Sequence, residues 1–142
     1  MSPSRRLRPV QQVAESREKR AAQHMGRARV HLAQEEAKLE QLRRYHQEYL
    51  ERFRQSASAG MNATQLQEYR AFLAKLDEAI RQQEEVVAAS QVDHTTQKDH
   101  WRQKHSRTQA LGKVVERYQH EERVAENRKE QKENDERNVR GK

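Results

Sequence analysis

The feature that most constrains this chain is a seven-residue repeat of apolar positions in a stretch without proline. Both prolines lie within the first ten residues. From residue 25 to 53, and again from 66 to 118, positions spaced alternately three and four apart are mostly apolar. Such a repeat is typical of long helices that pair along a supercoiled seam. The first run contains Met25, Ala28, Leu32, Glu35, Leu39, Leu42, His46, Tyr49 and Phe53. The second contains Leu66, Tyr69, Leu73, Leu76, Ile80, Gln83, Val87, Ser90, His94, Gln97, Trp101, Lys104, Thr108, Leu111, Val115 and Tyr118.

A short stretch of small residues, SASAG at 56–60, separates the two runs. Gly60 can take the left-handed conformation that ends a helix. Asn62 can cap the next helix, with Gln65 as its partner in a capping box. A short gap between two long helices makes them antiparallel neighbours. The sequence therefore predicts an all-α fold, an antiparallel two-helix coiled-coil hairpin with a longer second helix.

The domain boundaries follow from these runs and from the ends of the chain. We expect a basic disordered arm at 1–9, where both prolines lie, and a tail at 137–142. Helix one should span 10–55, the turn 56–62 and helix two 63–136. Counted back from the turn, helix one ends opposite about residue 110. Helix two should therefore overhang beyond that point without a partner in the chain.

Composition and charge narrow the function classes. Hydrophobic residues make up 32% of the chain and charged residues 36%, which argues against an ordinary globular domain. One alternative to the coiled-coil hairpin is therefore a disordered chain that folds only on its partner. The net charge is +7, but 29 basic residues are interleaved with 22 acidic ones, whereas nucleic-acid binding favours a stripe of one sign. These properties leave open one function class, a generic coiled-coil scaffold or a nucleic-acid-associated protein that uses the basic charge. It is the alternative to the function that the family resemblance below implies.

The chemistry of the side chains predicts a protein that is not an enzyme. The chain has no cysteine, no catalytic motif and no two histidines three or four residues apart, so we expect no metal, no cofactor and no small-molecule substrate. No apolar run approaches the roughly 20 residues that span a bilayer, which predicts a cytoplasmic location.

An aromatic pair is the most informative surface feature. Tyr45 and Phe72 each precede a seam position by one residue and fall roughly opposite each other when counted from the turn. A two-helix coiled coil does not fully bury such flanking positions. The rings therefore either thicken the seam or form a docking patch for another protein.

Four segments resemble the FliJ family of the bacterial flagellar export apparatus. They are KLEQLRRYHQEYL at 38–50, QEYRAFLAKLDEAIRQQ at 67–83, HWRQK at 100–104 and AENRKEQKENDE at 125–136. The resemblance implies an antiparallel coiled coil, similar in shape to the central stalk of rotary ATPases. It also implies binding to the hexameric export ATPase FliI, to the export gate protein FlhA and to export chaperones, at the cytoplasmic face of the inner membrane.

The resemblance also implies which residues meet these partners. The export-gate-binding patch would contain Leu42, Tyr45, Tyr49, Phe72, Leu76, Ala79 and Gln83. We expect the overhanging end of helix two, where charges of both signs alternate, to enter the ATPase ring. The ring contacts would be Arg117, Arg123, Glu126, Arg128, Lys132, Asp135 and Glu136. Many weak, exchangeable ion pairs suit a shaft that turns or rocks inside a ring.

Overall fold

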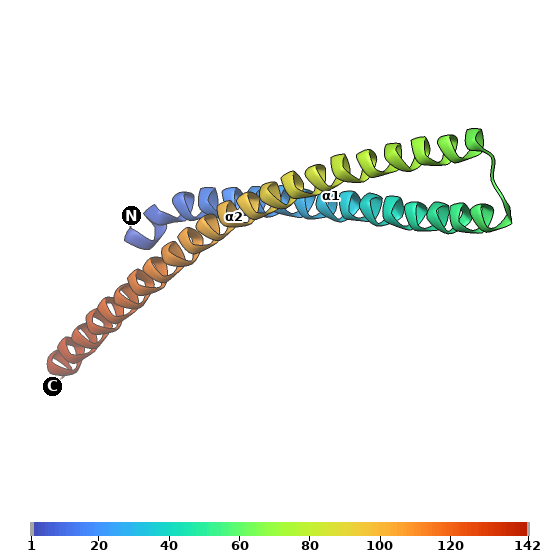
Figure 1. The fold of residues 1–142 in the computed structure, drawn as a ribbon. Coiled ribbons are helices and arrows are strands. Elements are labelled where there is room, and N and C mark those ends of the chain that lie inside the picture. Colours follow the sequence, from blue (N-terminus) through green and yellow to red (C-terminus); the bar gives the residue numbers. More distant parts are fainter. Residues whose placement is uncertain (1, 142) are drawn as a thin grey trace. The chain divides into compact units, whose positions relative to one another are not determined.

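The chain folds into two long helices, which a computed structural model describes for residues 2–141. Helix α1 spans Pro3–Ala59 and helix α2 spans Ala63–Arg140 (Figure 1). No strand occurs in this described range. The two helices pack against each other, and α2 is the longer one. The predicted fold class, an all-α helical hairpin, is therefore confirmed.

The seam follows the predicted seven-residue repeat. Every position of both predicted runs is buried or half-buried, including the polar members. Leu32, Leu39 and Leu76 are among the most buried apolar residues, and Glu35 and Ser90 are the buried polar ones between residues 2 and 141. No large side chain of the described chain is below 2% exposed, because two helices shield each other from one side only. The seam is thus a narrow core that water borders along its length.

The turn is shorter than expected, because the small residues before it are still helical. α1 continues through the SASA segment and ends at Ala59, four residues beyond the expected end at 55. Serine and alanine are compatible with helix, whereas Gly60 adopts φ 98°, a conformation that other residues rarely reach. The predicted cap is also present. Gln65 N donates to Asn62 Oδ1 at 2.8 Å, and Asn62 N donates to Gln65 Oε1 at 3.3 Å.

The N-terminal segment differs from the disordered arm that we expected at 1–9, because α1 already begins at Pro3. Proline is well tolerated in the first turn of a helix, where its missing N–H costs nothing. Ser2 caps this turn by accepting from Arg5 N at 3.4 Å. Pro9 lies inside the helix on its exposed side, so the carbonyl that loses its partner can be hydrated.

The C-terminal end of α2 leaves the seam later than expected. Half-buried positions continue to Val124, whereas every described residue from 125 to 141 is exposed. The unpartnered part of α2 therefore starts near residue 125 rather than near 110. The reason is the earlier start of α1, whose first turn reaches Glu122. The helix also continues to Arg140 through the region expected as a tail.

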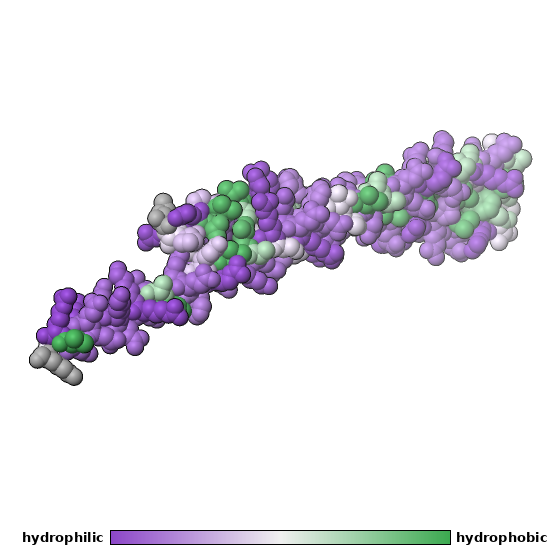
Figure 2. All heavy atoms as spheres, turned by 90° about the vertical axis from the view of Figure 1, so that its left-hand side faces the viewer, coloured by the Kyte–Doolittle hydropathy of each residue, from purple (hydrophilic) through white to green (hydrophobic). Residues whose placement is uncertain are grey.

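The contacts divide the chain into two compact units. The turn unit is Gln23–Lys98, and the terminal unit combines the residues up to Ala22 with those from Asp99 onward. Each unit contains one segment of α1 and one of α2. The face seen in Figure 2 is mostly hydrophilic, and its hydrophobic atoms lie in separate areas.

Candidate functional site

Five aromatic rings from both helices form a cluster in the turn unit. Tyr49 of α1 is central: its ring lies 4.3 Å from that of Phe72 and 5.2 Å from that of Tyr69. Tyr45 meets Phe72 edge-on at 6.2 Å, and Phe53 meets Tyr69 at 5.5 Å. Desolvation by burial raises the pKa of the Tyr49 hydroxyl above its ordinary value. The sequence placed Tyr45 and Phe72 opposite each other, and the structure brings them together.

The seven residues expected to bind the export gate have different surroundings. Tyr45 is 46% exposed, whereas Leu76 is only 7% exposed and belongs to the seam. The remaining five, Leu42, Tyr49, Phe72, Ala79 and Gln83, are half-buried. The part of this group that another protein can reach directly is therefore the ring of Tyr45 and the outer edges of its half-buried neighbours.

A polar layer interrupts the seam at Gln83. Its amide Nε2 donates to the Glu35 carboxylate at 2.6 Å and to the Glu35 backbone carbonyl at 2.9 Å. Lys38 Nζ supplies a second donor to that carboxylate at 3.2 Å. Both side-chain hydrogen bonds lower the pKa of Glu35, and the one from Gln83 has the larger effect. Gln83 is thus held by α1, and the layer favours this pairing of the helices because a shifted register would remove both hydrogen bonds from Gln83 to Glu35.

Pairs of polar and charged side chains border the aromatic cluster and the polar layer. His46 Nε2 lies 2.9 Å from Asp77 Oδ1, and Arg43 lies 3.6 Å from Glu84, so both pairs join α1 to α2. Arg81 pairs with Glu78 on the same helix, which lowers the pKa of the Glu78 carboxyl. Such exposed pairs contribute little energy individually. Their role here is to line the flanks of the seam with charge.

The terminal unit contains a second contact between the helices, built around His105. Its Nδ1 donates to Glu18 Oε1 at 2.5 Å, and its ring stacks on Trp101 at 5.0 Å. The hydrogen bond from His105 is the main cause that lowers the pKa of Glu18. This pair was not predicted from the sequence. Glu18 continues the three-and-four spacing backward from Ala21, and that spacing was the available signal.

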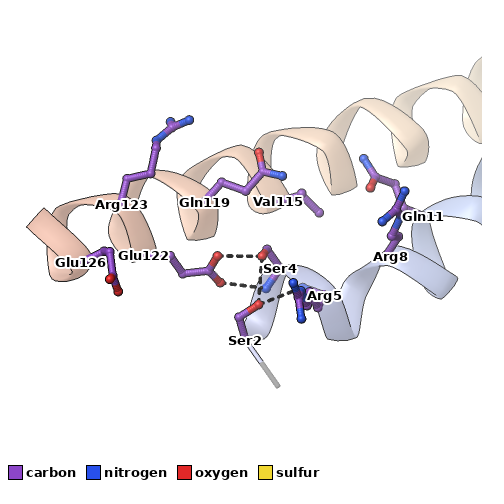
Figure 3. A pocket seen from close by; sticks show the side chains of 10 residues that line it. All are labelled: Ser2, Ser4, Arg5, Arg8, Gln11, Val115, Gln119, Glu122, Arg123 and Glu126. Carbon is purple, nitrogen blue, oxygen red and sulfur yellow. Dashed lines mark hydrogen bonds between the residues drawn. The ribbon is translucent and has the colours of Figure 1, made fainter.

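The first turn of α1 is fastened to α2 by one carboxylate (Figure 3). Ser4 donates to Glu122 twice, from its hydroxyl at 2.7 Å and from its backbone N–H at 3.1 Å. Both bonds lower the pKa of Glu122. A carboxylate is favourable here because the N-terminal end of a helix carries partial positive charge, and α1 has no acidic residue in its own first turn.

An open groove of about 890 Å³ adjoins this contact. Arg5, Arg8 and Gln11 line it from α1, and Gln119, Arg123 and Glu126 line it from α2 (Figure 3). Two of the expected ring contacts, Arg123 and Glu126, therefore lie beside the start of α1. All seven expected ring-contact residues are exposed. Five of them, Glu126, Arg128, Lys132, Asp135 and Glu136, lie on the unpartnered end of α2.

The described part of the chain offers no obvious centre for metal chemistry. Between residues 2 and 141, no three His, Cys, Asp or Glu side chains gather in a way that could hold a metal ion. Neither helix in this range has a stretch that is long and apolar enough to span a membrane. The aromatic cluster and the groove beside Glu122 are instead surface features of a helical hairpin.

The family model described as "Flagellar FliJ protein" matches residues 3–141, nearly the whole chain. The chain belongs to the FliJ family. The FliJ resemblance of the four segments between 38 and 136 is thereby confirmed. The match includes the first turns of α1, which lie before the four segments that resemble the family.

A curated FliJ relative supports the same assignment. The flagellar FliJ protein of Escherichia coli (strain K12) is 32% identical over 135 residues, which cover 92% of this chain and 88% of the E. coli protein. No solved structure matches this FliJ chain. The family assignment therefore rests on the sequence matches.

Proposed function

We propose that this FliJ family member is a non-enzymatic stalk and adaptor of the flagellar type III protein export apparatus. In this role it binds and activates the hexameric export ATPase FliI, contacts the export gate protein FlhA and export chaperones, and acts as a general chaperone-like component. It acts in the cytoplasm, at the inner membrane when docked on the apparatus. Family membership over residues 3–141 is the observation that carries the proposal.

The ring contact is proposed at the unpartnered end of α2. A helix surface that contacts nothing in its own chain is free to meet another protein. From 126 to 137 acidic and basic side chains alternate, and each exposed ion pair is worth about 0–1 kcal/mol. Such a surface forms many weak contacts that exchange without a large barrier, as a shaft inside a ring requires.

Truncation after Val124 tests the ring contact. Because the described residues that this truncation removes, 125–141, are all exposed, the truncated chain should keep the thermal unfolding midpoint of the full chain. It should fail to stimulate ATP hydrolysis by the purified hexameric ATPase. A matched control is Val92→Ala, a change at an exposed position of the turn unit, which should stimulate fully. Full stimulation by the truncated chain would defeat the assignment of this end.

The gate contact is proposed at the aromatic cluster. Tyr45 is the most exposed of the five rings, and Phe72 supports it edge-on. Aromatic side chains with this partial exposure are frequent anchors of protein interfaces. Phe72 also packs on Tyr49, so its removal affects the seam as well.

Tyr45→Ala is therefore the sharper test of the gate contact, with Tyr45→Phe as its matched control. The alanine variant should bind the purified gate protein more weakly, by about tenfold for the loss of a single anchor of 1–2 kcal/mol. The phenylalanine variant keeps the ring and should bind nearly as well. Unchanged binding by Tyr45→Ala would remove this residue from the proposed patch.

A further inference from the structure

A second apolar surface lies in the terminal unit, outside both proposed contacts. It is a shallow groove of about 260 Å³. The lining residues are Pro9, Val10, Val13, Ala14, Arg17 and Arg107. Val10 and Val13 are 44% and 51% exposed, which is high for side chains of this kind. Hydrophobic atoms gather on the N-terminal part of α1 among hydrophilic ones (Figure 2).

The rim of this groove is positively charged and lacks a counter-charge. Arg17 comes from α1 and Arg107 from α2, and neither forms a salt bridge with any residue between 2 and 141. Glu15 lies about 140° around α1 from Val10, on another side of the helix. Glu18 is bonded to His105. No acidic side chain lines the groove.

The surrounding sequence strengthens this positive field. Residues 1–22, which belong to the terminal unit, contain six basic and two acidic side chains, a net charge of +4 out of the chain's +7. The basic excess is therefore not spread evenly along the chain, although acidic and basic residues are interleaved elsewhere. A concentrated charge of one sign attracts and orients partners of the opposite sign.

We propose that this groove, the Val10/Val13 groove, binds an acidic amphipathic helix of a partner protein. Apolar side chains of that helix would lie between Val10 and Val13, and its flanking carboxylates would meet Arg17 and Arg107. Because the two arginines come from different helices, the partner would add a third helix along the hairpin. In helix-in-groove binding of this kind, the partner helix contacts the groove through apolar side chains spaced three and four residues apart.

The shape and chemistry of the groove favour this occupant over other anionic ones. Its volume is below the ~300–1,000 Å³ that is usual for small-molecule sites. Its walls are aliphatic and offer no ring on which a nucleic-acid base could stack. A membrane surface is entered by protruding apolar side chains, whereas a hollow between two helices receives a side chain from a partner.

The probe for this proposal is a synthetic amphipathic helical peptide with leucines along one face and glutamates on the flanks. Its control is the same peptide with glutamine at every glutamate position. The full chain should bind the glutamate peptide at least about tenfold more tightly, because two charge pairs of about 0.7 kcal/mol each amount to a factor of ten. Equal binding of both peptides would overturn the charge argument.

Charge reversal locates the binding on the protein. The double variant Arg17→Glu/Arg107→Glu should lose at least about tenfold in affinity for the glutamate peptide. The matched control, Lys19→Glu/Lys113→Glu, makes the same change in net charge in the terminal unit at exposed positions outside the groove lining, and should bind like the unchanged chain. Circular dichroism should show equal helicity for both variants. Equal losses in both variants would overturn the proposal, because the attraction would then be general.

Val13→Ser tests the apolar part without changing charge, and should weaken peptide binding at least about threefold. Vesicles of phosphatidylglycerol and a DNA duplex are run alongside. The proposal fails if either of them binds in a groove-dependent manner while the glutamate peptide does not.

Discussion

Leu76 and Tyr45 belong to one proposed gate-binding patch, yet the structure predicts opposite consequences for their removal. Leu76 is 7% exposed and packs in the seam, whereas Tyr45 is 46% exposed on its flank. Leu76→Ala should therefore destabilise the hairpin, and Tyr45→Ala should mainly weaken partner binding. Testing the two changes side by side separates residues that hold the patch in shape from residues that contact the partner directly.

The magnitudes follow from burial. Leu→Ala in a protein core costs about 2–5 kcal/mol, and the lower end, about 2–3 kcal/mol, applies here because water borders the seam and can fill the space. Tyr45→Ala removes a largely exposed ring and its edge-on contact with Phe72, whose ring centroid lies 6.2 Å away. Such a contact is worth about 0.5–1.5 kcal/mol, so the loss should be about 1 kcal/mol or less.

Urea unfolding followed by far-UV circular dichroism measures both changes. With a slope of about 2 kcal/mol/M, Leu76→Ala should lower the midpoint by about 1–1.5 M, and Tyr45→Ala by about 0.5 M or less. Val92→Ala, at a 66% exposed position, should leave the midpoint unchanged. The reasoning is refuted if Tyr45→Ala costs as much stability as Leu76→Ala, or if Leu76→Ala costs none.

Three further predictions concern the turn and the terminal unit. Gly60→Ala should cost about 1 kcal/mol in urea unfolding through backbone strain alone, since no atom lies within 4 Å of the added Cβ at φ 98°; an unchanged midpoint would contradict the left-handed turn. The pKa of Glu18 is lowered from its ordinary value of 4.5 in the folded state. Glu18 therefore stabilises the fold at pH values above 4.5, and this contribution is lost as the pH falls through the pKa of the folded state. Glu18→Gln should therefore flatten the acid side of the stability profile, and an unaltered profile would count against the His105 contact. Glu122→Ala should release the first turn of α1 and speed tryptic cleavage after Arg6 in the full chain, and equal cleavage rates would show that Glu122 does not hold this turn.

The sequence predicted the seam well because its physical signal is strong and local. A repeat of seven determines which side chains face the partner helix, so positions such as Leu39 and Leu76 could be placed without coordinates. The cap formed by Asn62 and Gln65 could be predicted for the same reason, since both partners lie within one turn.

The start of α1 was predicted wrongly because two prolines and several arginines read as a disordered arm. The repeat does continue through Gln11, Leu7 and Ser4, but two of these residues are polar and gave no apolar signal. What holds this segment is the carboxylate of Glu122, more than a hundred residues away in the sequence. A contact between residues so far apart depends on the register of the two helices, which periodicity alone does not give.

The two arginines of the Val10/Val13 groove illustrate the same limit. Arg17 and Arg107 each look like ordinary solvated residues in the sequence. They meet at one groove only because α1 and α2 run antiparallel in the register that the structure has.

The most direct test of the account is crosslinking of cysteine pairs across the hairpin. His46→Cys/Asp77→Cys replaces partners 2.9 Å apart in the turn unit, and Ser4→Cys/Glu122→Cys replaces partners 2.7 Å apart in the terminal unit. With a short thiol crosslinker at low protein concentration, each variant should give a crosslink within a single molecule, seen by mass spectrometry of its peptides. Crosslinks that form only between molecules, or fail to form in both variants, would contradict the antiparallel pairing of α1 and α2.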